Sequence, residues 1–84
     1  MSKKLFVGNL PETTSEYELF QLFRPFNSLT AKVPLDSDGH PRGFGFVRVP
    51  DETALDAIRK MDGLKLEGRQ LTVEEAAASQ RDEG

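Results

Sequence analysis

Apolar positions along this chain follow two different periods, and segments with one period alternate with segments of the other. Residues 5–10 form a short run rich in Phe and Val that Pro11 ends, which predicts a strand. Residues 29–33 and 68–75 alternate apolar and polar side chains, and residues 42–49 also change their kind of side chain with period two, which predicts three more strands. The segments between these strands carry apolar residues at helical spacing.

The first helical segment has recognisable start and stop signals. Ser15 is a candidate N-cap, and Glu18 three residues later completes a capping box. Pro25 and Asn27 are predicted to end this helix. Its apolar stripe consists of Leu19, Leu22, Phe23 and Phe26.

The second helical segment has the same apolar spacing. Asp51 is the predicted N-cap and Gly63 the predicted stop. Its stripe consists of Ala54, Ala57, Ile58 and Met61. The element order is therefore βαββαβ, which predicts an α+β sandwich with one four-stranded antiparallel sheet and two helices on one of its faces. The other face of that sheet is left open.

Residues 42–49 read Arg-Gly-Phe-Gly-Phe-Val-Arg-Val, and their alternation is unusual for a strand. One face combines two arginines, Arg42 and Arg48, with the rings of Phe44 and Phe46. The opposite face carries only glycine and valine. A core face needs bulk and a solvent face needs charge, so rings mixed with cations indicate a flat, anionic, stackable ligand such as single-stranded nucleic acid.

The composition narrows the class of protein. We expect the 84 residues to form a single domain over residues 1–75, followed by a flexible tail at 76–84. The chain has no cysteine, which excludes disulfides and thiolate metal sites. We also expect no membrane span and no signal peptide, because the first apolar run is broken at Gly8 and Asn9.

Two motifs resemble those of the RNA recognition motif family. Residues 42–49 agree with the family's octamer at every defined position except Val49, where the family has an aromatic residue. Residues 5–10, Leu-Phe-Val-Gly-Asn-Leu, resemble its hexamer. The resemblance covers about residues 4–75 and implies the ferredoxin-like fold, with the two motif strands side by side in the sheet.

The resemblance also implies roles for three phenylalanines. Phe6 and Phe44 resemble the two base-stacking rings of the family, and Phe46 resembles the third, which lies between sugars. All three are expected to face solvent on the open face. Val49 and the glycines Gly43 and Gly45 are expected to point toward the helices, where the glycines would allow close packing.

The open face is predicted to be cationic although the chain carries a net charge of −3. Alternation places four cations and Glu74 on this face, for a charge of +3. Arg42 and Lys4 are expected to reach phosphates, and Arg48 and Lys32 to assist them. Thr72 and Glu74 on the last strand could hydrogen-bond to base edges. The only histidine, His40, is expected to be exposed, and Asn9 to stabilise a turn.

These features lead to one functional hypothesis with two alternatives. We expect a monomeric module that binds single-stranded RNA without catalysis, cofactor or metal, in RNA processing or mRNA regulation in the nucleus or cytoplasm. Single-stranded DNA is one alternative ligand, because stacking does not read the 2′-hydroxyl. A protein partner is the other, bound through Tyr17 and Phe20, two aromatic residues that lie off the apolar stripe of the first helix.

Overall fold

A computed structural model describes residues 2–76 of the chain. Its main elements are β1 (Ser2–Gly8), α1 (Glu16–Leu22), β2 (Thr30–Lys32), β3 (Phe44–Pro50), α2 (Asp51–Met61) and β6 (Thr72–Glu75). Three short elements lie between them: the 3₁₀ turn η1 (Arg24–Phe26) and the strands β4 (Lys65–Leu66) and β5 (Arg69–Gln70). No helix within residues 2–76 is long and apolar enough to cross a membrane.

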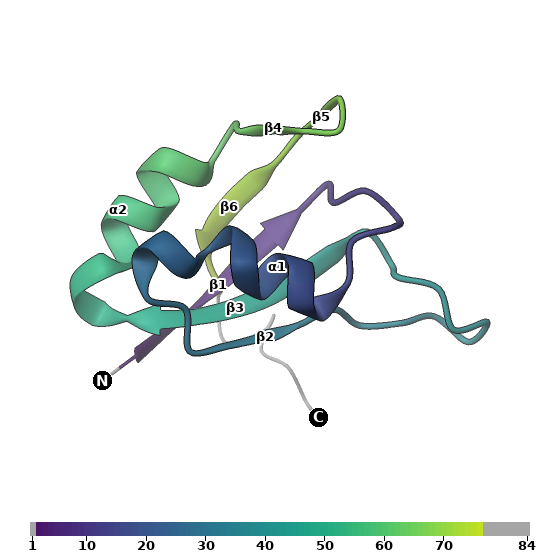
Figure 1. The fold of residues 1–84 in the computed structure, drawn as a ribbon, viewed down its shortest axis with the longest axis horizontal. Coiled ribbons are helices and arrows are strands. Elements are labelled where there is room, and N and C mark those ends of the chain that lie inside the picture. The colour runs from purple at the N-terminus through teal and green to yellow at the C-terminus, as the bar shows by residue number, and fades with distance from the viewer. Residues whose placement is uncertain (1, 77–84) are drawn as a thin grey trace.

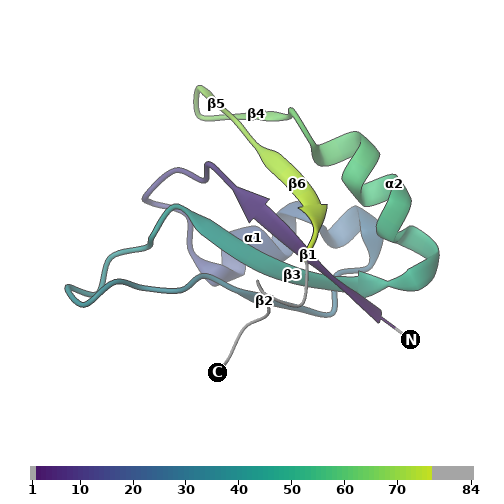
Figure 2. The same cartoon turned by 180° about the vertical axis from the view of Figure 1, so that it is seen from behind.

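Four strands form one antiparallel sheet in the order β2-β3-β1-β6. Both helices lie on the same face of this sheet (Figure 1). Seen from behind, β1 and β3 lie side by side in the middle of a face that no helix covers (Figure 2). The predicted α+β sandwich is confirmed, and so is the central position of the two motif strands.

The register of the central strands separates the two faces. Leu5 pairs with Val47, and Val7 pairs with Gly45 and Val73. These side chains are buried against the helices, in a core that also contains Leu19, Phe23, Ala54, Ala57 and Met61. Val49 is fully buried in this core, as the alternation predicts. Val49 stands where the octamer motif has an aromatic residue. This difference therefore concerns the packing of the core and not the open face.

Helix α1 begins as predicted but ends earlier. The hydroxyl of Ser15 accepts a hydrogen bond from the Glu18 amide at 3.1 Å, and the Glu18 carboxylate accepts one from the Ser15 amide at 2.9 Å. The prediction that one helix continues through Phe26 is wrong, because the chain turns into η1 after Leu22. Pro25 has no amide hydrogen to donate, and the residue before a proline disfavours the α conformation.

Helix α2 begins without a side-chain cap. Pro50 occupies the N-cap position, and Asp51 is the first helical residue, so the prediction that Asp51 is the cap is wrong by one position. At this position its carboxylate still lies at the positive end of the helix dipole. The helix ends at Met61, and Gly63 follows with a φ of +87°, a conformation that glycine adopts without strain.

The predicted opening of the last strand at Gly68 is also wrong. Gly68 and Glu67 both have positive φ and form the turn of a small hairpin between β4 and β5. The expectation that Gly43 packs against the helices is wrong: it lies before β3 with a φ of +91°, and the atom within 4 Å of a Cβ at this position would be the Leu10 carbonyl oxygen at 3.9 Å. Gly45 does face the helices: a Cβ atom there would lie 2.7 Å from Cδ2 of Leu19 and from the carbonyl oxygen of Lys32.

The chain after β6 lies partly outside the described residues. The amide of Ala76 donates a hydrogen bond to the carbonyl of Lys4 at 2.9 Å, which continues the pairing of β6 with β1. Residues 77–84 of the predicted tail lie outside the described residues.

Candidate nucleic-acid interface

Three phenylalanine rings from the two central strands gather on the helix-free face of the sheet. Phe6 in β1 lies directly opposite Phe46 in β3, with ring centroids 5.8 Å apart. The ring of Phe44 is 5.7 Å from that of Phe6 and 5.9 Å from that of Phe46. We call these three rings the ring platform. The structure therefore brings together all three ring residues that the motifs indicate.

The three rings differ in exposure. Phe6 and Phe44 are half-buried, whereas Phe46 is only 8% exposed. The expectation that all three rings face solvent is therefore wrong for Phe46. The ammonium of Lys4 lies 5.0 Å from the centroid of the Phe46 ring, and the two other rings flank it. Phe6 and Phe44 are the rings that a stacking ligand reaches first.

Gly8 gives the Phe6 ring its position. A Cβ atom at residue 8 would lie 2.9 Å from Cε2 of the Phe6 ring and 3.8 Å from Cβ of Thr72. The ring therefore leans along β1 over Gly8, the residue opposite Phe44 and Thr72 in the neighbouring strands. Any side chain at residue 8 would displace this ring.

The predicted cations surround the platform from several elements. The guanidinium carbon of Arg42 lies 5.5 Å from the centroid of the Phe44 ring, although Arg42 precedes β3 rather than lying within it. Lys4 in β1 lies opposite Arg48 in β3 in the strand register. The Arg48 guanidinium donates a hydrogen bond to the Ser2 hydroxyl at 3.1 Å. Lys32 lies opposite Phe46 on β2 and is exposed. Cations over ring faces add a favourable electrostatic contact that a phosphate can share.

Strand β6 borders the platform on its other side. Glu74 lies opposite Phe6, and Thr72 lies opposite Gly8; both side chains are exposed. Their position beside the Phe6 ring fits hydrogen bonding to the edge of a base stacked on it. Gln70, which alternation alone also places on this face, lies instead in the β4–β5 hairpin.

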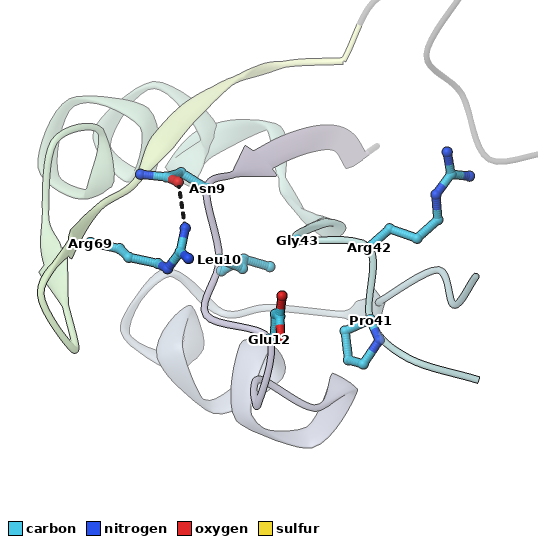
Figure 3. A pocket seen from close by; sticks show the side chains of 7 residues that line it. All are labelled: Asn9, Leu10, Glu12, Pro41, Arg42, Gly43 and Arg69. Atoms are coloured by element: carbon cyan, nitrogen blue, oxygen red, sulfur yellow. Dashed lines mark hydrogen bonds between the residues drawn. The ribbon is translucent and has the colours of Figure 1, made fainter. Parts of the chain in front are cut away.

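A small pocket is lined by Asn9 and Gly43, which follow the Gly8–Phe44 pair at the end of the sheet. Figure 3 shows its lining side chains. Its volume is about 260 Å³, and it is lined by Asn9, Leu10, Glu12, Pro41, Arg42, Gly43 and Arg69. Arg69 belongs to β5 and donates a hydrogen bond to the Asn9 side chain at 3.0 Å. The sequence offers no signal that this arginine joins the site, because 60 residues separate it from Asn9.

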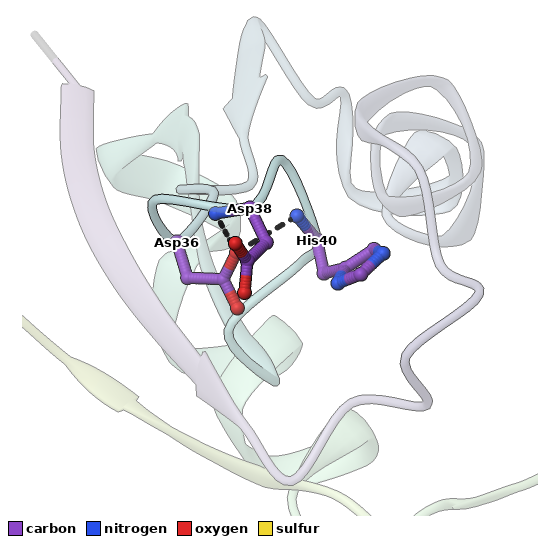
Figure 4. Close-up of side chains that lie close together, drawn as sticks. All are labelled: Asp36, Asp38 and His40. Atoms are coloured by element: carbon purple, nitrogen blue, oxygen red, sulfur yellow. Dashed lines mark hydrogen bonds between the residues drawn. The ribbon is translucent and has the colours of Figure 1, made fainter.

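The loop between β2 and β3 is closed by one carboxylate. Oδ1 of Asp36 accepts hydrogen bonds from the amides of Asp38 and His40 at 2.9 and 3.0 Å (Figure 4). The hydrogen bond from the His40 amide is the main cause that lowers the pKa of Asp36 below its usual value of 3.8. Ligand-type atoms of these three exposed residues all lie within 4.8 Å of one another, and the hydrogen bonds give Asp36 a role in folding the loop.

The two aromatic residues outside the stripe of α1 have different surroundings. Tyr17 is 71% exposed, whereas Phe20 is half-buried with the Arg24 guanidinium 5.9 Å from its ring. Tyr17 and the exposed Leu35 line a groove of about 680 Å³ between α1 and the β2–β3 loop. The structure does not bring Tyr17 and Phe20 into one groove lining: Tyr17 shares its groove with Leu35.

Known proteins with similar sequences include a glycine-rich RNA-binding protein and a cleavage stimulation factor subunit. The chain is 46% identical over 76 residues to glycine-rich RNA-binding protein 4, mitochondrial, of Arabidopsis thaliana, a match that covers 87% of this chain and 56% of that protein. It is 36% identical over 84 residues to the human cleavage stimulation factor subunit 2 tau variant, covering 96% of this chain and 14% of that protein. The chain thus spans about half, or much less, of these relatives.

Solved structures agree with the sequence comparison. The second RRM domain of the yeast poly(U)-binding protein superimposes with a TM-score of 0.81 at 35% identity, over 89% of this chain and 94% of that one. Residues 5–72, which contain both motifs and the whole ring platform, match the RNA recognition motif family. The chain therefore belongs to the RNA recognition motif family.

Proposed function

We propose that this domain binds single-stranded RNA on the helix-free face of its sheet, with bases stacked on Phe6 and Phe44. The observation that carries this proposal is the ring platform: three rings within 5.7–5.9 Å of one another, with cations over two of them. A base stacked on an aromatic ring contributes about 1–3 kcal/mol to the free energy of binding, and it requires an accessible ring face. The proposed activity is binding without catalysis.

The remaining side chains of the face contact the other parts of the bound strand: its phosphates and its base edges. The Lys4 ammonium lies over the Phe46 ring, and Phe46 becomes a third contact when Lys4 moves toward a phosphate. Arg42 is placed to reach the phosphate beside a base on Phe44. Arg48 and Lys32 extend the cationic border toward β2, and Thr72 and Glu74 read base edges along β6.

The relatives extend the proposal from binding to a biological role. The names of the plant relatives refer to RNA binding, and that of the human relative refers to a cleavage stimulation factor. We propose a role in RNA processing for the protein that contains this domain. Its location in the nucleus or cytoplasm stays a prediction.

The decisive experiment compares two single-ring variants. Phe44→Ala removes a platform ring, and we expect RNA affinity to fall by about tenfold or more, as loss of one stacked base implies. Tyr17→Ala is the matched control, because it removes the most exposed large ring from the helix side and leaves the sheet untouched. Affinity is measured with short labelled RNAs of random sequence, and folding with circular dichroism.

Equal affinities of wild type and Phe44→Ala for RNA, with both proteins folded, would contradict the proposal. An NMR titration with the random RNA pool should shift the signals of Phe6, Phe44 and their neighbours in β1 and β3. Parallel titrations with DNA of the same length test whether the 2′-hydroxyl contributes, because stacking alone treats both nucleic acids alike.

A second candidate function rests on the groove beside Tyr17. Its lining includes the apolar side chains of Val33, Leu35 and Pro41. Among residues 2–76, its charged lining residues are Glu12 and Glu16. Charge complementarity favours an extended segment of a partner protein with aliphatic and basic side chains. Binding of such a peptide should be weakened by Tyr17→Ala and unaffected by Phe44→Ala, the reverse of the pattern expected for RNA.

A further inference from the structure

We infer that the pocket beyond the ring platform binds a guanine base that is splayed out from the RNA strand. The inference concerns the pocket lined by Asn9, Leu10, Glu12, Pro41, Arg42, Gly43 and Arg69. It rests on the proposed function, since the platform must hold the rest of the strand. Single-stranded RNA is commonly read through unstacked bases whose edges reach side chains in such pockets.

The pocket lining is mainly polar: it combines the carboxylate of Glu12 with the side chains of Asn9, Arg42 and Arg69, and Leu10 and Pro41 are its apolar side chains. The Glu12 carboxylate and the Arg69 guanidinium enter it from different sides, and the Leu10 side chain lies between them (Figure 3). Arg69 hydrogen-bonds to the Asn9 amide oxygen rather than pairing with a carboxylate of the described residues. Glu12 is exposed, and the Glu12 carboxylate therefore stays available to a ligand.

This combination suits guanine better than the other bases. Guanine offers two acceptors, O6 and N7, which a guanidinium binds in bidentate fashion, and its N1–H and amino group donate to a carboxylate. Uracil and cytosine lack the O6/N7 pair, and adenine presents an amino group where guanine has O6. The apolar Leu10 and Pro41 border the space for the base plane, and about 260 Å³ is room enough for one base.

Hydrogen bonds hold the walls of the pocket in place before any ligand arrives. The Leu10 amide donates to the Gly43 carbonyl at 2.8 Å, which ties the segment after β1 to the start of β3. The Asn9 side chain donates to the Gln70 carbonyl at 2.9 Å and accepts from Arg69, which ties the same segment to the β4–β5 hairpin. Asn9 reaches both partners from a left-handed conformation, with a φ of 61°. A preformed pocket loses less entropy on binding.

The pocket is continuous with the platform. Gly8 and Phe44 are paired at the end of the sheet, and Asn9 and Gly43 are the next residue on each strand. The guanidinium of Arg42 lies over the Phe44 ring. In Figure 3 the Arg42 side chain points away from Glu12. A strand with one base on Phe44 can therefore place its neighbouring base in the pocket and its linking phosphate near Arg42.

The test measures base preference rather than affinity alone. Hexauridylate binding to wild-type protein is compared with that of hexamers carrying one guanosine, adenosine or cytidine at each position in turn. We expect guanosine at one position beside the stacked bases to be preferred by about tenfold, the effect of one good bidentate contact. Two analogues test the individual contacts. Inosine lacks the amino group that Glu12 would bind, and 7-deazaguanosine lacks the N7 acceptor, so each should bind less tightly than guanosine at that position.

Two variants assign the preference to the pocket. Arg69→Lys keeps the charge but loses the bidentate fork, and Glu12→Ala removes the acceptor. Each should reduce the guanosine preference to less than about twofold and change hexauridylate affinity by less than about twofold. Arg59→Lys and Glu67→Ala are the matched controls, since these exposed residues lie outside the pocket lining, and they should keep the full preference.

The outcomes distinguish this inference from the proposed function. A wild-type protein that binds hexauridylate without preferring guanosine at any position overturns the inference and leaves platform binding intact. An equal loss for all four bases in Arg69→Lys also overturns it, because it indicates a phosphate contact. Failure of every RNA to bind overturns the proposed function itself. Guanosine-dependent NMR shifts at the Leu10, Glu12 and Gly43 amides would support the pocket independently of affinity.

Discussion

Two glycines in the central strands show how single residues separate folding from binding on this sheet. Gly45 points toward the helices and Gly8 toward the ring platform, and neither has a positive φ, so alanine fits the backbone at both positions. Each site meets a different neighbour. A Cβ atom at residue 45 would come too close to a backbone oxygen and to the Leu19 side chain, whereas the contacts closer than 3.4 Å at residue 8 are with the end of the Phe6 ring.

Gly45→Ala is expected to destabilise the domain. The new Cβ atom would lie 2.7 Å from the Lys32 carbonyl oxygen and from Cδ2 of Leu19, so β2 and α1 would both have to move. Overpacking of this kind costs about 1–3 kcal/mol of unfolding free energy, measured by chemical denaturation. RNA affinity of the remaining folded protein should stay near wild type, because the platform lies on the opposite face. An unchanged denaturation midpoint would show that the helix layer yields without cost.

Gly8→Ala is expected to have the opposite effect. The Phe6 ring must move away from a Cβ atom that would otherwise lie 2.9 Å from Cε2, which breaks the arrangement of the platform. RNA affinity should fall by several-fold, while the unfolding free energy changes by less than about 1 kcal/mol, because a ring end on an open face can shift. The two glycine variants serve as controls for each other. Full RNA affinity in Gly8→Ala would mean that the orientation of Phe6 is unimportant.

Among the structural elements, the β2–β3 loop carries a carboxyl group whose pKa is lowered, that of Asp36. The amides of His40 and Asp38 stabilise the ionised form of Asp36, so the pKa of its carboxyl lies below 3.8 in the folded state. The stabilising contribution is therefore fully present above pH 3.8 and is lost as the pH falls through the folded-state pKa.

The expected behaviour of this loop can be measured by NMR. The carboxyl signal of Asp36 should titrate with a midpoint below 3.8, and the amide of His40 should exchange faster with solvent in Asp36→Asn than in wild type. Asp38→Asn is the control, because the described contacts use the amide of Asp38 and not its carboxylate. A midpoint at or above 3.8 would contradict this account of how the loop is closed.

The elements also show what local sequence signals can predict. The capping box at Ser15, the two apolar stripes and the alternation around Phe44 each depend on neighbours within a few residues, and the fold and the ring platform follow from them. The β4–β5 hairpin has strands of two residues, too short for any period to appear. Alternation assigns Phe46 to the open face but does not show that Lys4 covers it.

At the scale of the whole molecule, the charge of the chain is divided between its faces. The open face carries Lys4, Lys32, Arg42, Arg48 and Glu74, for a charge of +3, and the net charge of −3 leaves −6 for the rest of the chain. Much of that negative charge lies on and near the helices, where both first turns carry two acidic residues. This division orients an approaching polyanion toward the platform and repels it from the helix side.

The small number of cations on the open face limits how strongly salt can affect RNA binding. Each phosphate contact to a single strand contributes about 0.7 to the slope of log affinity against log salt concentration, so four contacts predict a slope of about −3. Lys4→Gln should make this slope shallower by about 0.7, since it removes one contact. Lys60→Gln removes the same charge from α2 and should leave the slope unchanged. A wild-type slope that implies six or more contacts would mean that RNA reaches cations beyond the sheet, because stacking on rings releases no counterions.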